Sequence, residues 1–275
     1  MVTHQSVTVS VEPGAVHPGE AVEVTVVVAG VADRKVRDGS VRLVRTDTAS
    51  EHQVGTYVNY DAQRDHEVVV AEASLGTGEG TSSFSFTLPE DAPPSATYGV
   101  EWSLRAVIER HRGLDAKAKA ALTVLAPHRA DAEALTAPPQ RKGLGYVDVE
   151  LDRRSFRPGD TVTGRAILRP TEPIRVSGVS VGFNRVDSFD ADPHCFKGDW
   201  KAVPAPSDIA AGEVHVCPFE LVLPADAAPT VDGSRLDPPS PVVVCWSVRV
   251  DSMLVHSMAD NDVRLDFEVY NTPGP

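Results

Sequence analysis

The chain has 275 residues, of which 41% are apolar and 24% charged, a composition that excludes wholesale disorder and suits about two globular domains. Its formal net charge of −13 argues against nucleic-acid or anionic-membrane binding, because like charges repel. No apolar run predicts a transmembrane helix, residues 1–10 do not resemble a signal peptide, and three cysteines predict no disulfide framework, so we expect a cytoplasmic protein.

Alternating apolar residues indicate β-strands in the first half of the chain. The pattern is clearest at residues 22–28, 84–88 and 100–108, where apolar side chains recur at every second position. Turn-rich pieces with proline and glycine separate these runs, as at residues 17–20 and 91–94. Many short strands of this kind predict an antiparallel β-sandwich.

The glycine-rich segment at residues 76–80 is the sequence's one candidate for a phosphate-binding loop. Its glycines lack the spacing of a dinucleotide-binding loop and lead into an expected strand, not into a helix. We therefore interpret the segment as a hairpin turn. The sequence also has no nucleophile elbow, no His-Glu-x-x-His and no Walker motif, and we assign no catalytic, cofactor-binding or metal-binding residue.

Residues 127–145 are expected to form a linker. Prolines and a glycine between residues 137 and 143 suit a semi-rigid connection. Residues 130–136 are the best helix candidate in the chain.

The second half of the chain repeats the first. At an offset of 140, residues 9–12 match 149–152, and the Pro-Gly-Glu at 18–20 matches Pro-Gly-Asp at 158–160. Later blocks match at offsets of 135 and 144, so a loop near residues 232–239 is about nine residues longer in the second copy. We therefore predict an all-β chain of two tandem antiparallel β-sandwich domains, residues 1–126 and 146–275.

These repeated motifs support a family comparison. Each half has an early strand with Pro-Gly-acid, then Phe-x-[Phe/Leu]-x-Leu-Pro, a proline loop and a Trp-Ser-x-Arg strand. This order resembles the arrestin-type domain, and two such domains joined by a linker resemble the arrestin fold over residues 5–270. Among arrestin-fold proteins, the bacterial sporulation-control family is the most similar in length and acidity. The excess of arginine over lysine also suits a high-GC bacterial source.

The departures from the family limit what the resemblance implies. Receptor-binding arrestins carry a lysine pair in their first strand that senses receptor phosphates, whereas residues 6–10 contain no base. The coat-protein tail and the Pro-Pro-x-Tyr motifs of trafficking relatives are also missing. The resemblance therefore implies a two-sandwich scaffold and gives no reason to expect a phosphorylated receptor as the partner.

A cluster of candidate metal ligands lies in the second half of the chain, which holds all three cysteines, and cysteine and histidine are the usual ligands of zinc. They are His194, Cys195, His215, Cys217, Cys245 and His256. No pair has Cys-x-x-Cys spacing, and strand alternation points Cys217 into the core and Cys245 the opposite way. We therefore favour structural cysteines over a metal site or a disulfide between these two.

An acidic segment raises the possibility of a calcium site. Asp187, Asp190 and Asp192 place hard oxygen ligands close together. The segment lacks the glycine and the terminal glutamate of a proper calcium loop, so we favour a solvated acidic loop.

Two side-chain pairs occupy equivalent positions in the repeat. Trp102 and Trp246 are expected to point inward as packing mass of the two cores. Arg105 and Arg249 are expected to point outward, where they either pair with neighbouring acids, which we favour, or line a face used for partners.

The sequence supports two hypotheses of function. The first is a non-enzymatic arrestin-like scaffold, adaptor or regulator that binds protein partners through exposed strand edges and can self-associate through them, in sporulation or developmental control. A net charge of −13 favours a basic partner, with maintenance of solubility as the alternative role of this charge. The alternative is a metal- or small-molecule-binding protein, including an enzyme, that uses the region of Cys195, His215 and Cys217.

Overall fold

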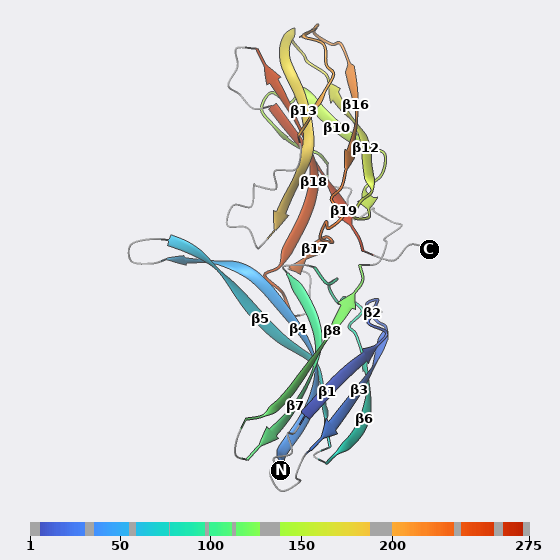
Figure 1. Cartoon of the computed structure of the whole chain (residues 1–275). Helices are drawn as coiled ribbons and strands as arrows, with labels where there is room; N and C mark the ends of the chain where they lie inside the picture. Colours follow the sequence, from blue (N-terminus) through green and yellow to red (C-terminus); the bar gives the residue numbers. More distant parts are fainter. Residues whose placement is uncertain are drawn as a thin grey trace. The chain divides into compact units, whose positions relative to one another are not determined.

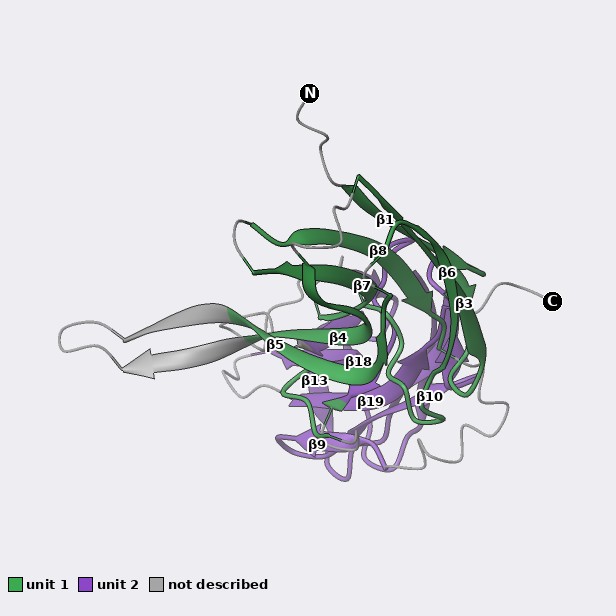
Figure 2. Cartoon of the chain, turned by 90° about the horizontal axis from the view of Figure 1, so that it is seen from below, with its two compact units in different colours: residues 1–127, 233–242 green, residues 128–232, 243–275 purple. Residues whose placement is uncertain are grey.

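The computed structural model describes residues 6–30, 36–54, 59–76, 78–96, 99–111, 114–126, 138–187, 200–233, 238–255 and 261–271, without the side chains of 50–63 and 187. The chain forms two compact units (Figures 1 and 2). Unit 1 comprises residues 1–127 and 233–242, and unit 2 comprises residues 128–232 and 243–275. The described residues contain no helix that is long and apolar enough to cross a membrane.

Unit 1 consists of two sheets. Its strands are β1 (Ser6–Glu12), β2 (Ala15–Val16), β3 (Ala21–Ala29), β4 (Val36–Val54), β5 (Asn59–Ser74), β6 (Gly80–Thr87), β7 (Val100–Arg110) and β8 (Ala116–Val124). One sheet has the order β1-β3-β6 and the other the order β2-β8-β7-β4-β5. Alternate valines of β3 and the apolar side chains of β7 are buried between the sheets, since β-branched residues on a two-residue period fill one face of a pleated strand. The predicted sandwich is confirmed.

Unit 2 repeats this topology. Its strands are β9 (Gln140–Lys142), β10 (Val147–Leu151), β11 (Ser155–Phe156), β12 (Thr161–Leu168), β13 (Ile174–Asp187), β14 (Lys201–Val203), β15 (Asp208–Ile209), β16 (His215–Val222), β17 (Val231–Asp232), β18 (Val243–Leu254) and β19 (Asn261–Val269). One sheet has the order β10-β12-β16, and the second contains β11-β19-β18-β13-β14. In both units a two-residue strand, β2 or β11, pairs in parallel with the last strand of the unit.

The repeat extends to the register of the strand pairs. Val9 lies opposite Val26 in unit 1, and the residues 140 positions later, Val149 and Ala166, lie opposite each other in unit 2. A one-residue slip would turn every core side chain outward, so a shared register means that the two cores are built from the same positions. The all-β fold class and the internal repeat are therefore confirmed.

The Pro-Gly-acid motif of unit 1 is a tight turn that binds the Leu-Pro motif. Gly19 has a φ of 81°, a value that glycine adopts without the strain of a Cβ. Its amide donates to the carbonyl oxygen of Pro89 (3.1 Å), and the amide of Leu88 donates to the carbonyl oxygen of Glu20 (3.0 Å).

The same two bonds recur in unit 2. The amide of Gly159 donates to the carbonyl oxygen of Pro224 (3.2 Å), and that of Leu223 donates to the carbonyl oxygen of Asp160 (2.9 Å). In each copy, the Pro-Gly-acid motif and the Leu-Pro motif therefore bond to each other.

The glycine-rich segment is not a hairpin turn. It joins β5, in the five-stranded sheet, to β6, which pairs with β3 in the three-stranded sheet. The chain therefore crosses from one sheet to the other here, and the sequence interpretation was wrong, because the turn signals of glycine do not specify which strands become neighbours.

Two other expectations concern the connections between the copies. The helix candidate at residues 130–136 lies outside the described residues, while β9, within the expected linker, pairs with β19. The longer loop of the second copy overlaps residues 233–242, which group with unit 1. The domain limits 1–126 and 146–275, with the linker 127–145 between them, stay a prediction.

Candidate interaction edge

Strand β6 forms one edge of the three-stranded sheet in unit 1. It pairs with β3 on one side, and no described strand pairs with it on the other. Because the amide of Leu88 donates to Glu20, the alternation of an antiparallel ladder directs the even-numbered residues of β6 toward β3. The odd-numbered residues therefore direct their N–H and C=O groups away from the sheet. They are Thr81, Ser83, Ser85 and Thr87.

The side chains of this edge are small, and the strand is uncharged. The four hydroxyl side chains at its odd positions are exposed, and residues 80–88 contain no ionisable group. On the inner face Phe84 is half-buried, and its ring stacks on that of Phe86 with centroids 6.5 Å apart. An unpaired edge with exposed backbone donors and acceptors can accept a strand from another chain.

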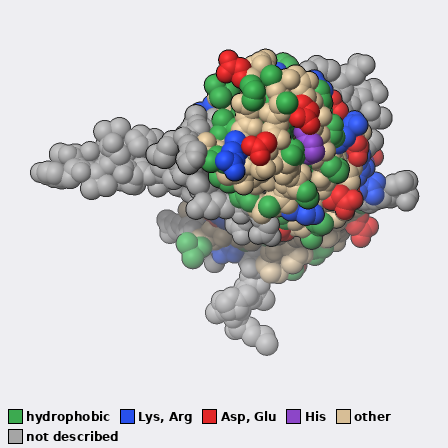
Figure 3. Space-filling view, turned by 90° about the horizontal axis from the view of Figure 1, so that it is seen from above, with side chains coloured by type: hydrophobic (Ala, Val, Ile, Leu, Met, Phe, Trp, Pro, Cys, Tyr) green, Lys and Arg blue, Asp and Glu red, His purple; other side chains and the backbone are tan. Residues whose placement is uncertain are grey.

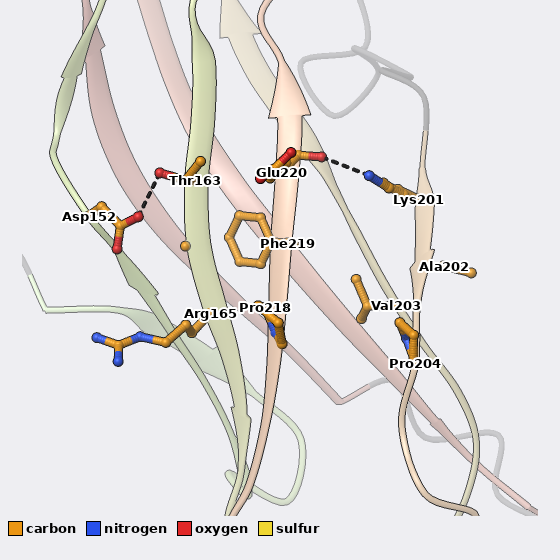
Figure 4. Close-up of a pocket in the computed structure, with 11 residues that line it drawn as sticks. Asp152, Thr163, Arg165, Lys201, Ala202, Val203, Pro204, Pro218, Phe219 and Glu220 are labelled. Carbon is orange, nitrogen blue, oxygen red and sulfur yellow. Dashed lines mark hydrogen bonds between the residues drawn. The ribbon is translucent and has the colours of Figure 1, made fainter.

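The equivalent edge in unit 2, strand β16, is closed in two ways. The amide of Leu223 donates to Asp160, so the outward positions of β16 are the even-numbered ones. One of these is Pro218, which has no N–H to offer a further strand, a common protection of edges in β-sheet proteins. The carbonyl oxygen of another, Glu220, accepts a hydrogen bond from Nζ of Lys201 (3.2 Å; Figure 4).

The offset of 135 places Ser83 of unit 1 at the position of Pro218. The two copies thus differ at an edge that has the same place in both three-stranded sheets. This difference was not found from the sequence, although a proline inside an expected strand is a signal for an edge position.

An open groove of about 680 Å³ lies between β12, β14 and β16 of unit 2 (Figure 4). Its polar groups already bond within the groove, since Oγ1 of Thr163 donates to Asp152 (2.6 Å) and Lys201 bonds to the backbone of β16. The charged residues that line the groove are two acids and two bases, namely Asp152, Glu220, Arg165 and Lys201. On the separate face seen in Figure 3, basic and acidic side chains are interspersed as well. The groove therefore offers neither an excess of one charge nor an open row of backbone groups.

The two outward arginines pair with acids, as favoured from the sequence. Nη1 of Arg105 lies 2.7 Å from Oε1 of Glu67. Arg249 pairs with Asp251 at 2.9 Å and with Asp262 at 2.8 Å. These guanidinium groups are thus held by neighbours on their own sheets.

The two tryptophans point into the cores, as predicted, with 2% of Trp102 and 1% of Trp246 exposed. A shared feature was not foreseen: each indole N–H donates to a backbone carbonyl oxygen at 2.9 Å, that of Pro93 for Trp102 and that of Ala228 for Trp246. The acceptors are 135 residues apart, so the bond belongs to the repeat. Both rings serve as core residues with a satisfied polar group.

The cysteine and histidine candidates are only partly within the described residues. Cys217 is buried, Cys245 is exposed, and both are free thiols, as alternation predicted. Burial raises the pKa of the Cys217 thiol, so the sulfur is held protonated and apolar. Cys195 lies outside the described residues together with His194 and His256, whereas His215 is half-buried on β16.

The acidic candidates cannot be assembled into a site. The backbone of Asp187 ends β13, and Asp190 and Asp192 lie outside the described residues. Within the described parts of the chain, no three histidine, cysteine or acidic residues gather in a way that could hold a metal ion.

One carboxyl group in unit 2 has a perturbed pKa. Burial raises the pKa of Asp266 on β19, and the opposing attraction of Arg154 and Arg264 is the smaller effect. Nη1 of Arg154 also donates to the backbone carbonyl of Asp266 (3.1 Å). Asp266 lies on β19 in the larger sheet of unit 2 and so is not part of the three-stranded sheet of that unit.

Comparison with known proteins gives one family. Residues 6–131 match the model of the family described as "Arrestin (or S-antigen), N-terminal domain". No curated protein matches the chain. The matched residues contain β1 to β8, and unit 2 repeats their order and register. The first half of the chain is thus similar to the N-terminal domain of the arrestins, which supports a place in the arrestin-fold superfamily.

Proposed function

We propose that the chain is a non-enzymatic, arrestin-like scaffold or adaptor that binds a protein partner by adding a strand of the partner to β6. The observation that carries this proposal is the open row of backbone groups on β6, beside the closed edge of β16. Because the sandwich already holds β6 in register, binding of a strand does not require β6 itself to become ordered.

The cellular setting follows from the resemblance of the sequence motifs. We propose a cytoplasmic protein of a bacterium, acting in sporulation or developmental control. The length and acidity of the chain and its excess of arginine over lysine support this setting, and the family match to residues 6–131 supports the adaptor class.

The experiment is crosslinked affinity capture with variants of β6. Ser83→Pro copies the residue of the closed edge and removes one outward N–H, whereas Ser83→Ala changes the same side chain and retains that N–H. We expect Ser83→Pro to lose the partners that the wild type and Ser83→Ala retain. Circular dichroism checks that both variants are folded.

A second control addresses the other copy. Pro218→Ser restores the N–H to β16 and leaves β6 unchanged. If Ser83→Pro captures the same proteins as the wild type, the edge is not the binding site and the proposal is wrong.

A further inference from the structure

We infer that the segment received by β6 is basic, with lysine or arginine alternating with apolar residues. This inference rests on the proposed function and specifies the chemistry of the partner. It follows from the acidic side chains on the outer face of the three-stranded sheet of unit 1.

Two glutamates face each other on that sheet without a cation. Glu12 on β1 lies directly opposite Glu23 on β3, and both side chains are exposed. Like charges at directly opposite positions destabilise a sheet. Strands β1, β3 and β6 contain no basic residue, and neither glutamate forms an ion pair within the described parts of the chain.

The strand register places this pair of glutamates in line with the open edge of β6. Glu23 lies opposite Ser85, so Glu12, Glu23 and Ser85 form one row across the sheet. A residue added beside Ser85 would lie about 10 Å from the backbone of Glu23, two strand spacings away. Long lysine and arginine side chains can cover that distance together with the glutamate side chain, and a short or acidic side chain cannot pair there.

The inner face sets the alternate positions of the partner. Residues that lie opposite the even positions of β6 would point toward the sandwich, beside the half-buried ring of Phe84. An apolar side chain there would cover the exposed part of that ring. A segment of alternating basic and apolar residues therefore matches both faces.

Unit 2 lacks both features at the equivalent positions. The counterparts of Glu12 and Glu23 are Asp152 and Thr163, and Oγ1 of Thr163 donates to Asp152 (2.6 Å). The carboxylate therefore has a partner where the edge is closed by Pro218. The open edge and the unrelieved acidic pair occur together in unit 1.

The test measures peptide binding to the full chain by fluorescence anisotropy. The probe is a labelled eight-residue peptide of alternating lysine and valine, and the comparison peptide has glutamate in place of lysine. We expect the lysine peptide to bind at least tenfold more tightly, with an affinity that falls as salt rises. Glu23→Gln should weaken it by about two- to fivefold, the range of an exposed ion pair.

Edge variants separate strand addition from general attraction to an acidic protein. Ser83→Pro retains every charge, so we expect it to lose the lysine peptide by at least tenfold while Ser83→Ala binds normally. Ser85→Lys, which puts a cation opposite Glu23, provides a second test should the proline variant fold poorly. It should weaken the lysine peptide at least as much as Glu23→Gln does, because it occupies the glutamate and adds a like charge beside the peptide.

Each contrary outcome has a distinct meaning. Equal binding of the two peptides at β6 overturns the basic partner and leaves the adaptor proposal standing. Full binding of the lysine peptide by both Ser83→Pro and Ser85→Lys shows attraction to the general surface and overturns the inference, while the capture experiment still decides the adaptor proposal. A dimer in sedimentation that Ser83→Pro abolishes would make a second copy the occupant and likewise overturn it.

Discussion

A buried ion pair in unit 1 yields the sharpest prediction about stability. Nη2 of Arg45 lies 3.0 Å from Oδ2 of Asp47, and their side chains are only 3% and 1% exposed. Nη2 also donates to the carbonyl oxygen of Pro238 (3.0 Å). Asp47→Ala would leave a buried guanidinium without its carboxylate, and we expect unit 1 to lose about 3–5 kcal/mol of unfolding free energy.

The same strand provides a matched control. Nε of Arg42 lies 2.8 Å from Oε1 of Glu72, but these side chains are 38% and 46% exposed. Since solvent screens an exposed pair, Glu72→Ala should cost about 0–1 kcal/mol. Each pair joins an arginine of β4 to a carboxylate, on β4 itself for Asp47 and on β5 for Glu72, and the large difference between them is burial. The comparison therefore tests the cost of removing a partner from a buried charge.

Hydrogen exchange of β7 peptides during urea unfolding reports on unit 1 in the intact chain. The reasoning is refuted if Asp47→Ala costs no more than Glu72→Ala. As a further check, replacing Arg45 and Asp47 together by leucines should restore most of the loss, because no unpaired charge is then buried.

Three further outcomes are expected. In a Cys195→Ser background, Cys245 should react with a thiol reagent in the folded protein and Cys217 only on unfolding, because Cys245 is exposed whereas Cys217 is buried. The pKa of both thiols is raised, that of Cys217 by burial and that of Cys245 by desolvation together with Asp266 and Asp232, so access to the sulfur decides the difference. Simultaneous labelling would contradict this. Gly159→Ala should lower the free energy of unfolding in urea by about 1–2 kcal/mol, because the φ of 84° at this position strains any residue with a Cβ, although there is space for the Cβ itself. An unchanged urea midpoint would contradict this. Asp266→Asn should raise the melting temperature at pH 7, because the raised pKa of this carboxyl group means that its ionised form opposes folding above that pKa. The gain should vanish as the pH falls below the ordinary aspartate pKa, where the carboxyl group is protonated in both the folded and the unfolded chain. A gain that persists there would refute the assignment.

The features that the sequence predicted are those with a local period. Alternation placed Trp102, Trp246 and Cys217 inside, and the internal repeat predicted two similar sandwiches. Partner choice between strands is a long-range property, so the crossing between sheets at residues 76–80 was mistaken for a hairpin. The indole bonds could not be foreseen, because a carbonyl acceptor has no side-chain signature.

The candidate edge could be predicted from the sequence only in part. Comparing the copies position by position sets Ser83 against Pro218, and that contrast alone indicates one open and one closed edge. Which groups of β6 face outward needed the observed bond of Leu88 to Glu20.

Under the proposed function, the closed edge of β16 also sets how many partners one molecule can bind by strand addition. A protein with this edge open in both of its duplicated domains could bind two neighbours and form an open-ended polymer. Heterologous contacts that do not close into a ring have this effect. With one edge sealed, each molecule can be occupied once at this position, so a complex formed there has a fixed stoichiometry. Duplication followed by one substitution would thus turn a unit prone to polymerise into a monovalent receptor.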